Sequence, residues 1–347
     1  MALTSQHGPA EDEEAASVLL PSALRGEYYP TEWWELMTCY CQDVAAGKLT
    51  TGPPPPKGSS RAGLLRVAQW NLHNFLGPWK EERTADAIAE VLLGFDADVL
   101  VLQECGYSYS EVYDGDYLPG QLASTLFDRG YEILVARVSC PVLLAVRLHV
   151  MGREAVALDR GNLGAGKYSA AFAHLQVPGG AEVGIYGTHL AHSDWDQNEH
   201  WEGGLRLEQV KPLLDHCRAR LPPELPVLIV ADFNQPRREQ HPPEEWRLLA
   251  ESMQRRYAPE DDGVSTLLQK EGFLCCFDGL DNSSVGRNWP VGKPPPPTHW
   301  TGTVVDYTFA RRLQLLGVYV HSTDLSDHLP VVTDWVVPAS GDHASAQ

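Results

Sequence analysis

The sequence predicts an α/β fold in which two packed, mixed β-sheets are covered by helices. After residue 63, short apolar runs of strand length alternate with segments that repeat apolar residues at helical spacing. Ten such runs stand beside four helical segments, a count that suits two packed sheets with helices on their faces. The segments 131–146 and 170–187 each hold two runs joined by a short turn, as antiparallel hairpins do, so the sheets are not purely parallel.

The expected strands are short runs rich in apolar residues and bounded by Gly, Pro or polar residues. The expected helices repeat apolar residues every three or four positions. The strands are expected at residues 64–70, 98–102, 131–136, 142–146, 170–176, 182–187, 227–230, 304–309, 317–320 and 331–336, and the helices at residues 82–93, 118–128, 202–220 and 244–256.

The two ends of the chain differ in composition from the rest. Residues 1–16 are acidic and small, and we expect a disordered tail there. Residues 17–50 form an extension with one predicted helix, and the Pro/Gly/Ser-rich residues 51–63 are expected to be a linker. These boundaries leave residues 64–337 as the main domain and residues 338–347 as a flexible C-terminal tail.

The predicted helix of the extension carries an apolar stripe. Trp33, Leu36, Met37 and Tyr40 follow the spacing i, i+3, i+4, i+7 of one helix face. Such a stripe either packs on its own domain or docks a partner protein. The sequence leaves both open, and residues 28–47 are the expected place for a protein partner.

Net charge limits the classes of substrate. The chain of 347 residues carries 27 Lys and Arg against 46 Asp and Glu, a formal net charge of −19. Because duplex DNA is bound mainly through cations that neutralise its phosphates, broad affinity for duplex DNA is not expected. A phosphate would have to be received by a local group of cations or by a bound metal.

We expect the protein to be intracellular, in the cytoplasm or the nucleus. The start of the chain lacks the basic region and long apolar region of a secretory signal. No stretch reaches the roughly 18 apolar residues of a transmembrane span. The 7 cysteines are an odd number without a regular framework, which favours reduced thiols over disulfides.

Polar residues stand at the boundaries of six predicted strands. Any one of them is explained equally well as a helix cap or a turn former. Because strand ends lie close together at one rim of a layered α/β fold, six in order indicate a ligand site. The residues are Asn71, Gln103 and Glu104, Thr188 and His189, Asp232 and Asn234, Asp306, and Asp327 with His328.

The order of these motifs is more specific than any one of them. They read Gln69-Trp70-Asn71, Leu102-Gln103-Glu104, Gly187-Thr188-His189-Leu190, Ala231-Asp232-Phe233-Asn234, Val305-Asp306-Tyr307-Thr308-Phe309 and Ser326-Asp327-His328-Leu329-Pro330. In this order they resemble the endonuclease/exonuclease/phosphatase superfamily, which has the deoxyribonuclease I-like fold. The resemblance covers residues 64–337. It implies a four-layer α/β sandwich, dependence on Mg²⁺, with Mn²⁺ as an alternative, and hydrolysis of a phosphoester.

The resemblance also implies a metal ligand set and a catalytic pair. Glu104 would be the main Mg²⁺ carboxylate, with Asn71 beside it and Asp327 close to the metal. Asp306 would fix the imidazole of His328, which engages the attacking water or the phosphate. Without a metal, the clustered carboxylates are expected to repel one another and to bind protons more tightly.

Further residues would handle the water and the phosphate. By the same resemblance, Asp232 and Asn234 would orient the attacking water and hold a phosphoryl oxygen. His189 would donate a hydrogen bond to a non-bridging oxygen in the transition state. Tyr168, just before a strand, stands where some relatives carry a tyrosine that contacts phosphate.

Tryptophans near these strand ends are candidates for substrate binding. Trp195 and Trp201 lie in the segment after the histidine-bearing strand, and Trp300 follows a Pro-rich tract. They could stack on a base or a sugar, or they could pin their loops to the surface. Together with His189, His192 and His200 in the same segment also suggest zinc, but no thiolate ligand accompanies them.

Three classes of function remain open from the sequence. The favoured one is a phosphodiesterase that acts on nucleic-acid ends, lesions or small nucleotides. A lipid or inositol phosphate phosphoesterase would call for apolar rim loops or a membrane anchor, and neither is clear in the sequence. A non-catalytic scaffold would be expected to lack the metal acid or the imidazole, yet Glu104 and His328 are both present.

Overall fold

A computed structural model of the chain describes residues 31–49, 63–136, 141–158, 168–191, 204–237, 243, 263–278 and 296–339. The expected N-terminal tail at 1–16 and the expected helix at 244–256 lie outside these residues, as do most of the expected linker and C-terminal tail. The described part contains every strand end singled out by the motifs.

The strands of the described residues form two mixed sheets. The strands are β1 (Leu64–Asn71), β2 (Val99–Gln103), β3 (Glu132–Val135), β4 (Leu143–Val146), β5 (His149–Ala157), β6 (Ser169–Gln176), β7 (Glu182–His189), β8 (Val227–Asp232), β9 (Leu274–Cys275), β10 (Asp306–Arg311), β11 (Gln314–Val320) and β12 (Val331–Val336). One six-stranded sheet has the order β11-β12-β1-β2-β4-β3, and the other has the order β5-β6-β7-β8-β10-β9. Each contains one parallel pair, β1 with β2 and β7 with β8. The expectation of mixed sheets with hairpins, here β3 with β4 and β6 with β7, is confirmed.

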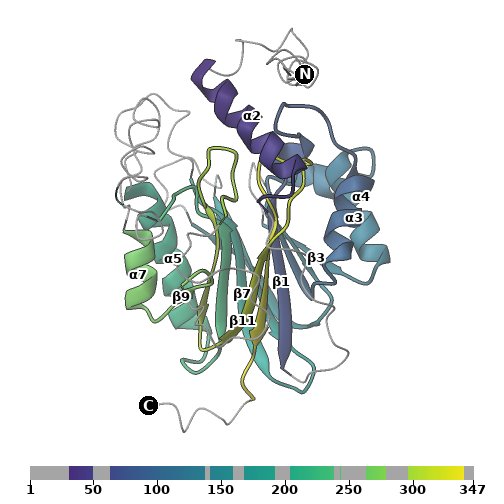
Figure 1. The fold of residues 1–347 in the computed structure, drawn as a ribbon. Helices are drawn as coiled ribbons and strands as arrows, with labels where there is room; N and C mark the ends of the chain where they lie inside the picture. The colour runs from purple at the N-terminus through teal and green to yellow at the C-terminus, as the bar shows by residue number, and fades with distance from the viewer. Residues whose placement is uncertain are drawn as a thin grey trace, which may run out of the picture.

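Helices cover the outer face of each sheet (Figure 1). α3 (Ala85–Gly94) and α4 (Leu118–Asp128) lie on the first sheet. α5 (Gly204–Arg220) and α7 (Val264–Lys270) lie on the second. The layers therefore run helix, sheet, sheet, helix, which is the predicted four-layer α/β sandwich.

The central strands could be predicted from the sequence because they are buried on both faces. In β1, Leu65 and Val67 belong to the main core between the sheets. Ala68 and Trp70, which point the other way, belong to a second core beneath α3 and α4. All four are buried, and a strand buried on both faces reads as a continuous apolar run.

Three elements of the structure lack a signal in the sequence patterns. β5 is an edge strand of the second sheet, and most of its residues are exposed, so it has no apolar run. β9 has 2 residues and α7 has 7, which is too short for periodicity to be recognised. The strand predicted at residues 304–309 is observed as β10 at residues 306–311. The bounds differ because the first residues of the apolar run come before the hydrogen-bonded part of the strand.

The predicted helix of the extension is present as α2 (Thr31–Ala45) and lies across one end of the sheets (Figure 1). Tyr40 and Val44, one turn apart on the helix, are buried in the main core. Ser322 Oγ donates to the carbonyl oxygen of Val44 at 2.9 Å. This face of the helix therefore packs on its own domain. The structure does not describe the side chains of residues 31–37.

The described helices include none with the length and apolar character needed to cross a membrane. The six cysteines of the described residues are all free thiols. For these six, the structure agrees with the expected reduced state.

Candidate active site

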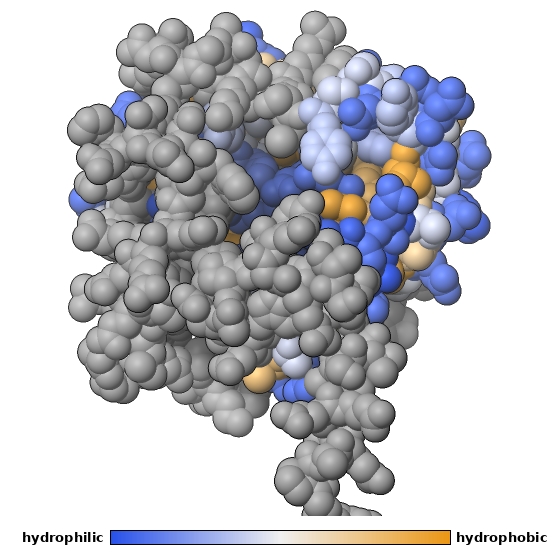
Figure 2. All heavy atoms as spheres, turned by 90° about the horizontal axis from the view of Figure 1, so that it is seen from above, coloured by the Kyte–Doolittle hydropathy of each residue, from blue (hydrophilic) through white to orange (hydrophobic). Residues whose placement is uncertain are grey.

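The polar residues at the strand ends meet at one rim of the two sheets. In each sheet the parallel pair directs two carboxyl ends to the same side. In the second sheet, Asp232 is in register with His189 on one neighbouring strand and with Asp306 on the other. Figure 2 views the molecule from above, toward the end that carries this rim. Hydrophilic residues lie together near the centre of that view.

Asn71 joins the two sheets at the rim. Its Nδ2 group donates to Asp232 Oδ2 at 2.9 Å and to Glu104 Oε1 at 3.2 Å. Its Oδ1 atom accepts from the backbone N–H of His73 at 2.9 Å, which fixes the orientation of the amide. One amide thus holds two carboxylates that come from different sheets.

Glu104 follows β2 in a left-handed conformation, with φ of 47°, that non-glycine residues rarely adopt. Its Oε2 atom accepts from Asn74 Nδ2 at 3.0 Å. Burial acts to raise the pKa of the Glu104 carboxyl. Attraction from His189, His73 and His328 outweighs burial and lowers this pKa below its ordinary value. The expectation of tighter proton binding is therefore wrong for Glu104, because imidazoles surround it.

His328 and Asp306 form a buried pair. His328 Nδ1 donates to Asp306 Oδ2 at 3.0 Å, and His328 Nε2 lies 3.8 Å from Asp232 Oδ2. Burial disfavours the imidazolium, but attraction from Asp306 and from two further carboxylates raises the pKa of His328 to about 10. Burial, opposed by the attraction of His328, raises the pKa of Asp306 to about 6. The imidazole therefore keeps its proton at neutral pH and points Nε2 into the rim.

Asn234 holds the other imidazole of the rim. Its Nδ2 group donates to His189 Nε2 at 2.8 Å and to the Leu190 carbonyl oxygen at 3.0 Å. Its backbone N–H donates to Asp232 Oδ1 at 2.8 Å, a contact made possible by a left-handed φ of 52°. His189 Nε2 lies 3.5 Å from Asp232 Oδ2. The Asp232 carboxylate is therefore held from both sheets and faces both imidazoles.

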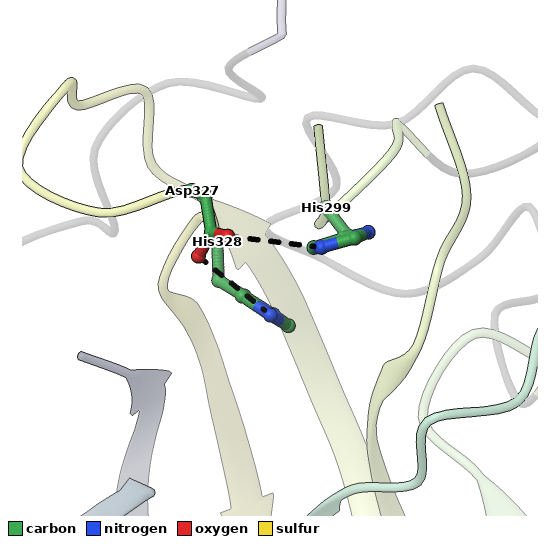
Figure 3. Close-up of side chains that lie close together, drawn as sticks. All are labelled: His299, Asp327 and His328. Carbon is green, nitrogen blue, oxygen red and sulfur yellow. Dashed lines mark ion pairs between the residues drawn. The ribbon is translucent and has the colours of Figure 1, made fainter. Parts of the chain in front are cut away.

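Imidazoles also surround the carboxylate of Asp327. Its Oδ1 atom lies 3.4 Å from His73 Nδ1 and 3.9 Å from His328 Nε2, and its Oδ2 atom lies 4.0 Å from His299 Nε2. Figure 3 shows the carboxylate directed at both His299 and His328. Asp327 Oδ1 is buried and has no hydrogen-bond partner among the described residues.

Two polar residues at the rim were not predicted from the sequence. His73 and Asn74 lie in the short 3₁₀ helix η2 (His73–Phe75) after β1, both with left-handed φ values. Lys80 Nζ contacts His73 Nε2. The signal that could have found His73 and Asn74 was their place just after Asn71. His299, which directly precedes the predicted Trp300, forms an isolated antiparallel bridge with His328.

Residues of α5 brace the loops behind the rim. Gln209 Oε1 accepts from the backbone N–H of Ala191 at 2.8 Å. Arg206 donates to the Ala191 carbonyl oxygen at 3.2 Å and to Gln235 Oε1 at 2.7 Å. These contacts fix the chain just beyond His189 and Asn234.

Two of the predicted substrate-binding residues are described. Tyr168 lies half-buried directly before β6, at the rim, because β6 runs antiparallel to β7. Trp300 is buried with 6% of its surface exposed, and its ring centroid lies 5.5 Å from that of His299. A ring so deeply buried offers little surface to a ligand, whereas His299 beside it faces Asp327. The residues outside the description are Trp195, Trp201, His192 and His200.

The donor atoms of the rim fit a divalent cation that prefers oxygen. Glu104, Asp232 and Asp327 contribute carboxylates that pair with no Lys or Arg among the described residues. Two groups of three residues could each hold a metal ion, with one ligand atom from each residue. One group is His299, Asp327 and His328, and the other is Asp232, Asp306 and His328. Asn71 offers its NH₂ to the carboxylates, so its amide would have to turn over to give a metal its oxygen.

A family profile matches most of the chain. The profile of the Endonuclease/Exonuclease/phosphatase family covers residues 68–328, which include every strand-end residue of the rim. The chain belongs to the endonuclease/exonuclease/phosphatase family. The resemblance read from the order of the motifs is thereby confirmed. No curated protein sequence matches the chain.

Solved structures of this family share the fold. An endonuclease/exonuclease/phosphatase from Beutenbergia cavernae DSM 12333 is 19% identical over 79% of this chain and 72% of its own, with a TM-score of 0.56. The human nocturnin catalytic domain with bound sulfate is 20% identical over 81% and 98%, with a TM-score of 0.52. ANGEL2, a 2′,3′-cyclic phosphatase in complex with adenosine-2′,3′-vanadate, is 15% identical over 78% and 95%, with a TM-score of 0.51. At these identities the likeness shows the fold alone.

Proposed function

We propose that the protein is a Mg²⁺-dependent phosphodiesterase that acts on a nucleic acid or a nucleotide by in-line attack of water. The observation that carries the proposal is the buried His328–Asp306 pair, held beside the carboxylates of Glu104 and Asp232 at one rim. Phosphodiester hydrolysis needs a positioned water, a proton donor and neutralisation of the phosphoryl oxygens. The rim offers a group for each of these tasks.

His328 and Asp232 are the proposed acid and base. His328 carries a proton at Nε2 because Nδ1 is tied to Asp306 and the ring is an imidazolium at neutral pH. That proton can go to a phosphoryl or leaving-group oxygen. Asp232, fixed by the backbone N–H of Asn234 and the amide of Asn71, can orient the attacking water and accept its proton.

His189 and Asn234 are the proposed ligands of a phosphoryl oxygen. In the structure the amide of Asn234 donates to His189 Nε2. A phosphoryl oxygen placed between them would accept a hydrogen bond from each once the imidazole is protonated at Nε2. Catalytic hydrogen bonds of this kind often form only with substrate present. The pair would then stabilise charge that develops in the transition state.

Glu104 and Asp327 are the proposed metal ligands, with Asn71 beside them. A bound Mg²⁺, or Mn²⁺ in its place, would neutralise charge on the phosphoryl oxygens and on the leaving group. Asp327 Oδ1, buried without a hydrogen-bond partner among the described residues, supports a role as ligand.

Charge and related structures support a nucleotide substrate. A net charge of −19 disfavours broad affinity for duplex DNA and leaves recognition to the rim itself. Of the similar structures, the ANGEL2 complex holds an adenosine-2′,3′-vanadate and the nocturnin domain holds a sulfate. Lipid and inositol phosphates, and a scaffold without catalysis, are the competing outcomes.

A substrate panel tests the proposal. Full-length protein is incubated with Mg²⁺ or with EDTA and offered single-stranded and abasic DNA, a 5′-tyrosyl oligonucleotide, RNA, a 2′,3′-cyclic nucleotide, sphingomyelin and inositol phosphates. We expect hydrolysis of a nucleic-acid or nucleotide substrate that EDTA abolishes. Hydrolysis confined to the lipid or inositol phosphates would overturn the substrate class, and no hydrolysis at all would favour the scaffold.

Location and partners remain part of the proposal. We propose that the protein works inside the cell, in the cytoplasm or the nucleus, which the six free thiols support. A protein partner at residues 28–47 would have to use the side of α2 that faces away from Tyr40 and Val44, since those two are buried in the domain.

A further inference from the structure

A tight loop after β1 brings a lysine to the rim. The two ends of the loop 76–82 are joined by an isolated antiparallel bridge, and within it the backbone N–H of Lys80 donates to the Gly77 carbonyl oxygen at 3.0 Å. Arg83, directly after the loop, donates to the Asp324 carbonyl oxygen at 2.8 Å. The loop is therefore fixed to the segment that leads into β12.

The backbone of this region is strained at four positions. His73, Asn74, Phe75 and Lys80 have left-handed φ values of 46°, 54°, 64° and 65°, which non-glycine residues rarely adopt. Such conformations persist only where the surrounding structure holds them, and they concentrate at functional sites. His73 is at the rim already, since its Nδ1 atom lies 3.4 Å from Asp327 Oδ1. The strained backbone of Lys80 is consistent with a role for its side chain at the same place.

The ammonium of Lys80 contacts an imidazole and no carboxylate. Lys80 Nζ donates to His73 Nε2, so a neutral His73 ring carries its proton on Nδ1, which faces Asp327 Oδ1. Among the described residues no carboxylate forms an ion pair with Lys80, because Glu81, its neighbour in the sequence, pairs with Arg83. The half-buried ammonium therefore keeps its charge available to an anion, in a chain with 46 acidic residues against 27 basic ones.

The distance of Lys80 from the proposed acid indicates which phosphate it can reach. Asp327 Oδ1 lies 3.9 Å from His328 Nε2 and 3.4 Å from His73 Nδ1. Lys80 lies beyond, at the opposite nitrogen of the His73 ring. The scissile phosphate is proposed to bind at His328, so a carboxylate and an imidazole ring separate it from the ammonium. Lys80 is therefore placed for a neighbouring phosphate, which in a nucleic-acid strand is one sugar away.

We propose that Lys80 is a substrate-binding residue whose Nζ donates to a phosphate next to the scissile one, so that the preferred substrate is a strand with more than one phosphate. The inference rests on the proposed function and names the substrate class within it. A phosphate oxygen is a stronger partner for the ammonium than the neutral imidazole is, because the hydrogen bond then joins two opposite charges. One cation held at the rim also attracts a strand locally, while the chain as a whole repels it.

The salt dependence of oligonucleotide binding tests the inference. Two end-labelled probes of about ten nucleotides, oligo-dT and oligo-U, are titrated with full-length protein at several NaCl concentrations, and fluorescence anisotropy gives the affinity. Ca²⁺ replaces Mg²⁺ to slow hydrolysis, and electrophoresis checks that the probes stay intact. Each phosphate contact made by a lysine contributes about −0.7 to the slope of log K against log salt for a single strand.

Lys80→Asn is the test variant, because asparagine adopts a left-handed φ more readily than most residues do. We expect it to bind the preferred probe about tenfold more weakly, as loss of one hydrogen bond between charged groups implies. The slope of its salt dependence should be smaller in magnitude by about 0.7.

Two further variants separate loss of the charge from damage to the fold. Lys80→Arg keeps the cation and should keep the wild-type slope. Lys211→Gln removes the same charge from α5, which covers the outer face of the second sheet, where half-buried Lys211 pairs with Glu208 (Figure 1). It should bind the probes as wild type does. Melting followed by circular dichroism checks that every variant is folded.

A Lys80→Asn protein with the wild-type slope would overturn the inference even if its affinity fell, because the ammonium would then support the loop and not bind phosphate. A wild type that binds neither probe but hydrolyses a nucleotide of the substrate panel would also overturn it, and would leave the proposed function standing. A wild type that binds neither probe and hydrolyses no nucleic acid or nucleotide would overturn both.

Discussion

At the scale of single residues, the chemistry of His328 is set by groups from other parts of the chain. Asp306, which binds its Nδ1 atom, lies on β10, 22 positions away in the sequence. Asp232, which faces its Nε2 atom, lies at the end of β8. The adjacent Asp327 is a more distant neighbour of the ring, at 3.9 Å. Adjacency in sequence therefore does not define the pair, and the register of the strands does.

We predict that the His328 imidazole in metal-free protein titrates near its raised pKa of about 10. Folding then favours the imidazolium, so its contribution to stability is complete below about 6.5 and is lost as the pH rises through about 10. Proton NMR of the histidine ring signals between pH 6 and 10 measures this, with the His328 signal assigned from a His328→Gln variant. In Asp306→Asn the pKa of His328 should fall well below about 10, because the strongest attraction is lost while burial still lowers it, and Asp232 and Asp327 remain to raise it. A His328 signal that titrates near 6.5 in wild type would contradict the predicted pairing.

The site residues that the sequence predicted and those that it missed differ in a physical way. Asn71, Glu104, His189 and Asp232 each end an apolar run, so the fold class already places them at one rim. His73 and Asn74 lie in the turn after β1, where a polar residue needs no ligand to explain it. Trp300 was predicted from its position after a Pro-rich tract, but its burial depends on packing, which no local pattern reveals.

At the scale of elements, the two parallel pairs create the site. β1 with β2 and β7 with β8 bring four carboxyl ends to one rim, and Asn71 ties the two pairs together. These strands are buried on both faces and could be predicted from their apolar runs. β5 could not be predicted, because apolar and polar residues alternate only weakly along an exposed edge strand. The docking of α2 depends on tertiary contacts of Tyr40 and Val44, for which the stripe left two interpretations open.

Removal of residues 1–60 should destabilise the domain. Loss of α2 takes two buried side chains, Tyr40 and Val44, out of the main core and exposes the surface beneath them. At about 1.5–3 kcal/mol for each buried apolar side chain, the free energy of unfolding should fall by about 3 kcal/mol or more. Urea denaturation followed by circular dichroism measures the change.

Removal of residues 1–16 alone is the control for this truncation, and it should leave the denaturation midpoint unchanged, since this segment is the predicted tail. A truncation at residue 60 that unfolds at the same urea concentration as the full chain would contradict the packing of α2 on the domain.

At the scale of the whole molecule, an acidic protein is proposed to act on an acidic substrate. The formal charge of −19 repels phosphate at long range, while the described rim gathers imidazoles and the oxygen ligands of a divalent cation. The groups come from both sheets, with Asn71 and Glu104 on the first and His189, Asp232 and Asp306 on the second. The proposed activity therefore depends on the assembled sandwich, and we expect no contribution to it from long-range attraction to nucleic acid.

The turnover rate of the panel substrate by His328→Ala tests the central claim most directly. Wild type, His328→Ala and His216→Ala are compared at saturating Mg²⁺, with folding checked by circular dichroism. His216 is a matched control because it is a half-buried histidine bound to Tyr186 and Glu154, outside the rim. We predict that His328→Ala turns over at least about a hundredfold more slowly, as loss of a general acid typically causes, and that His216→Ala retains activity. A folded His328→Ala protein that keeps the wild-type rate would contradict the account.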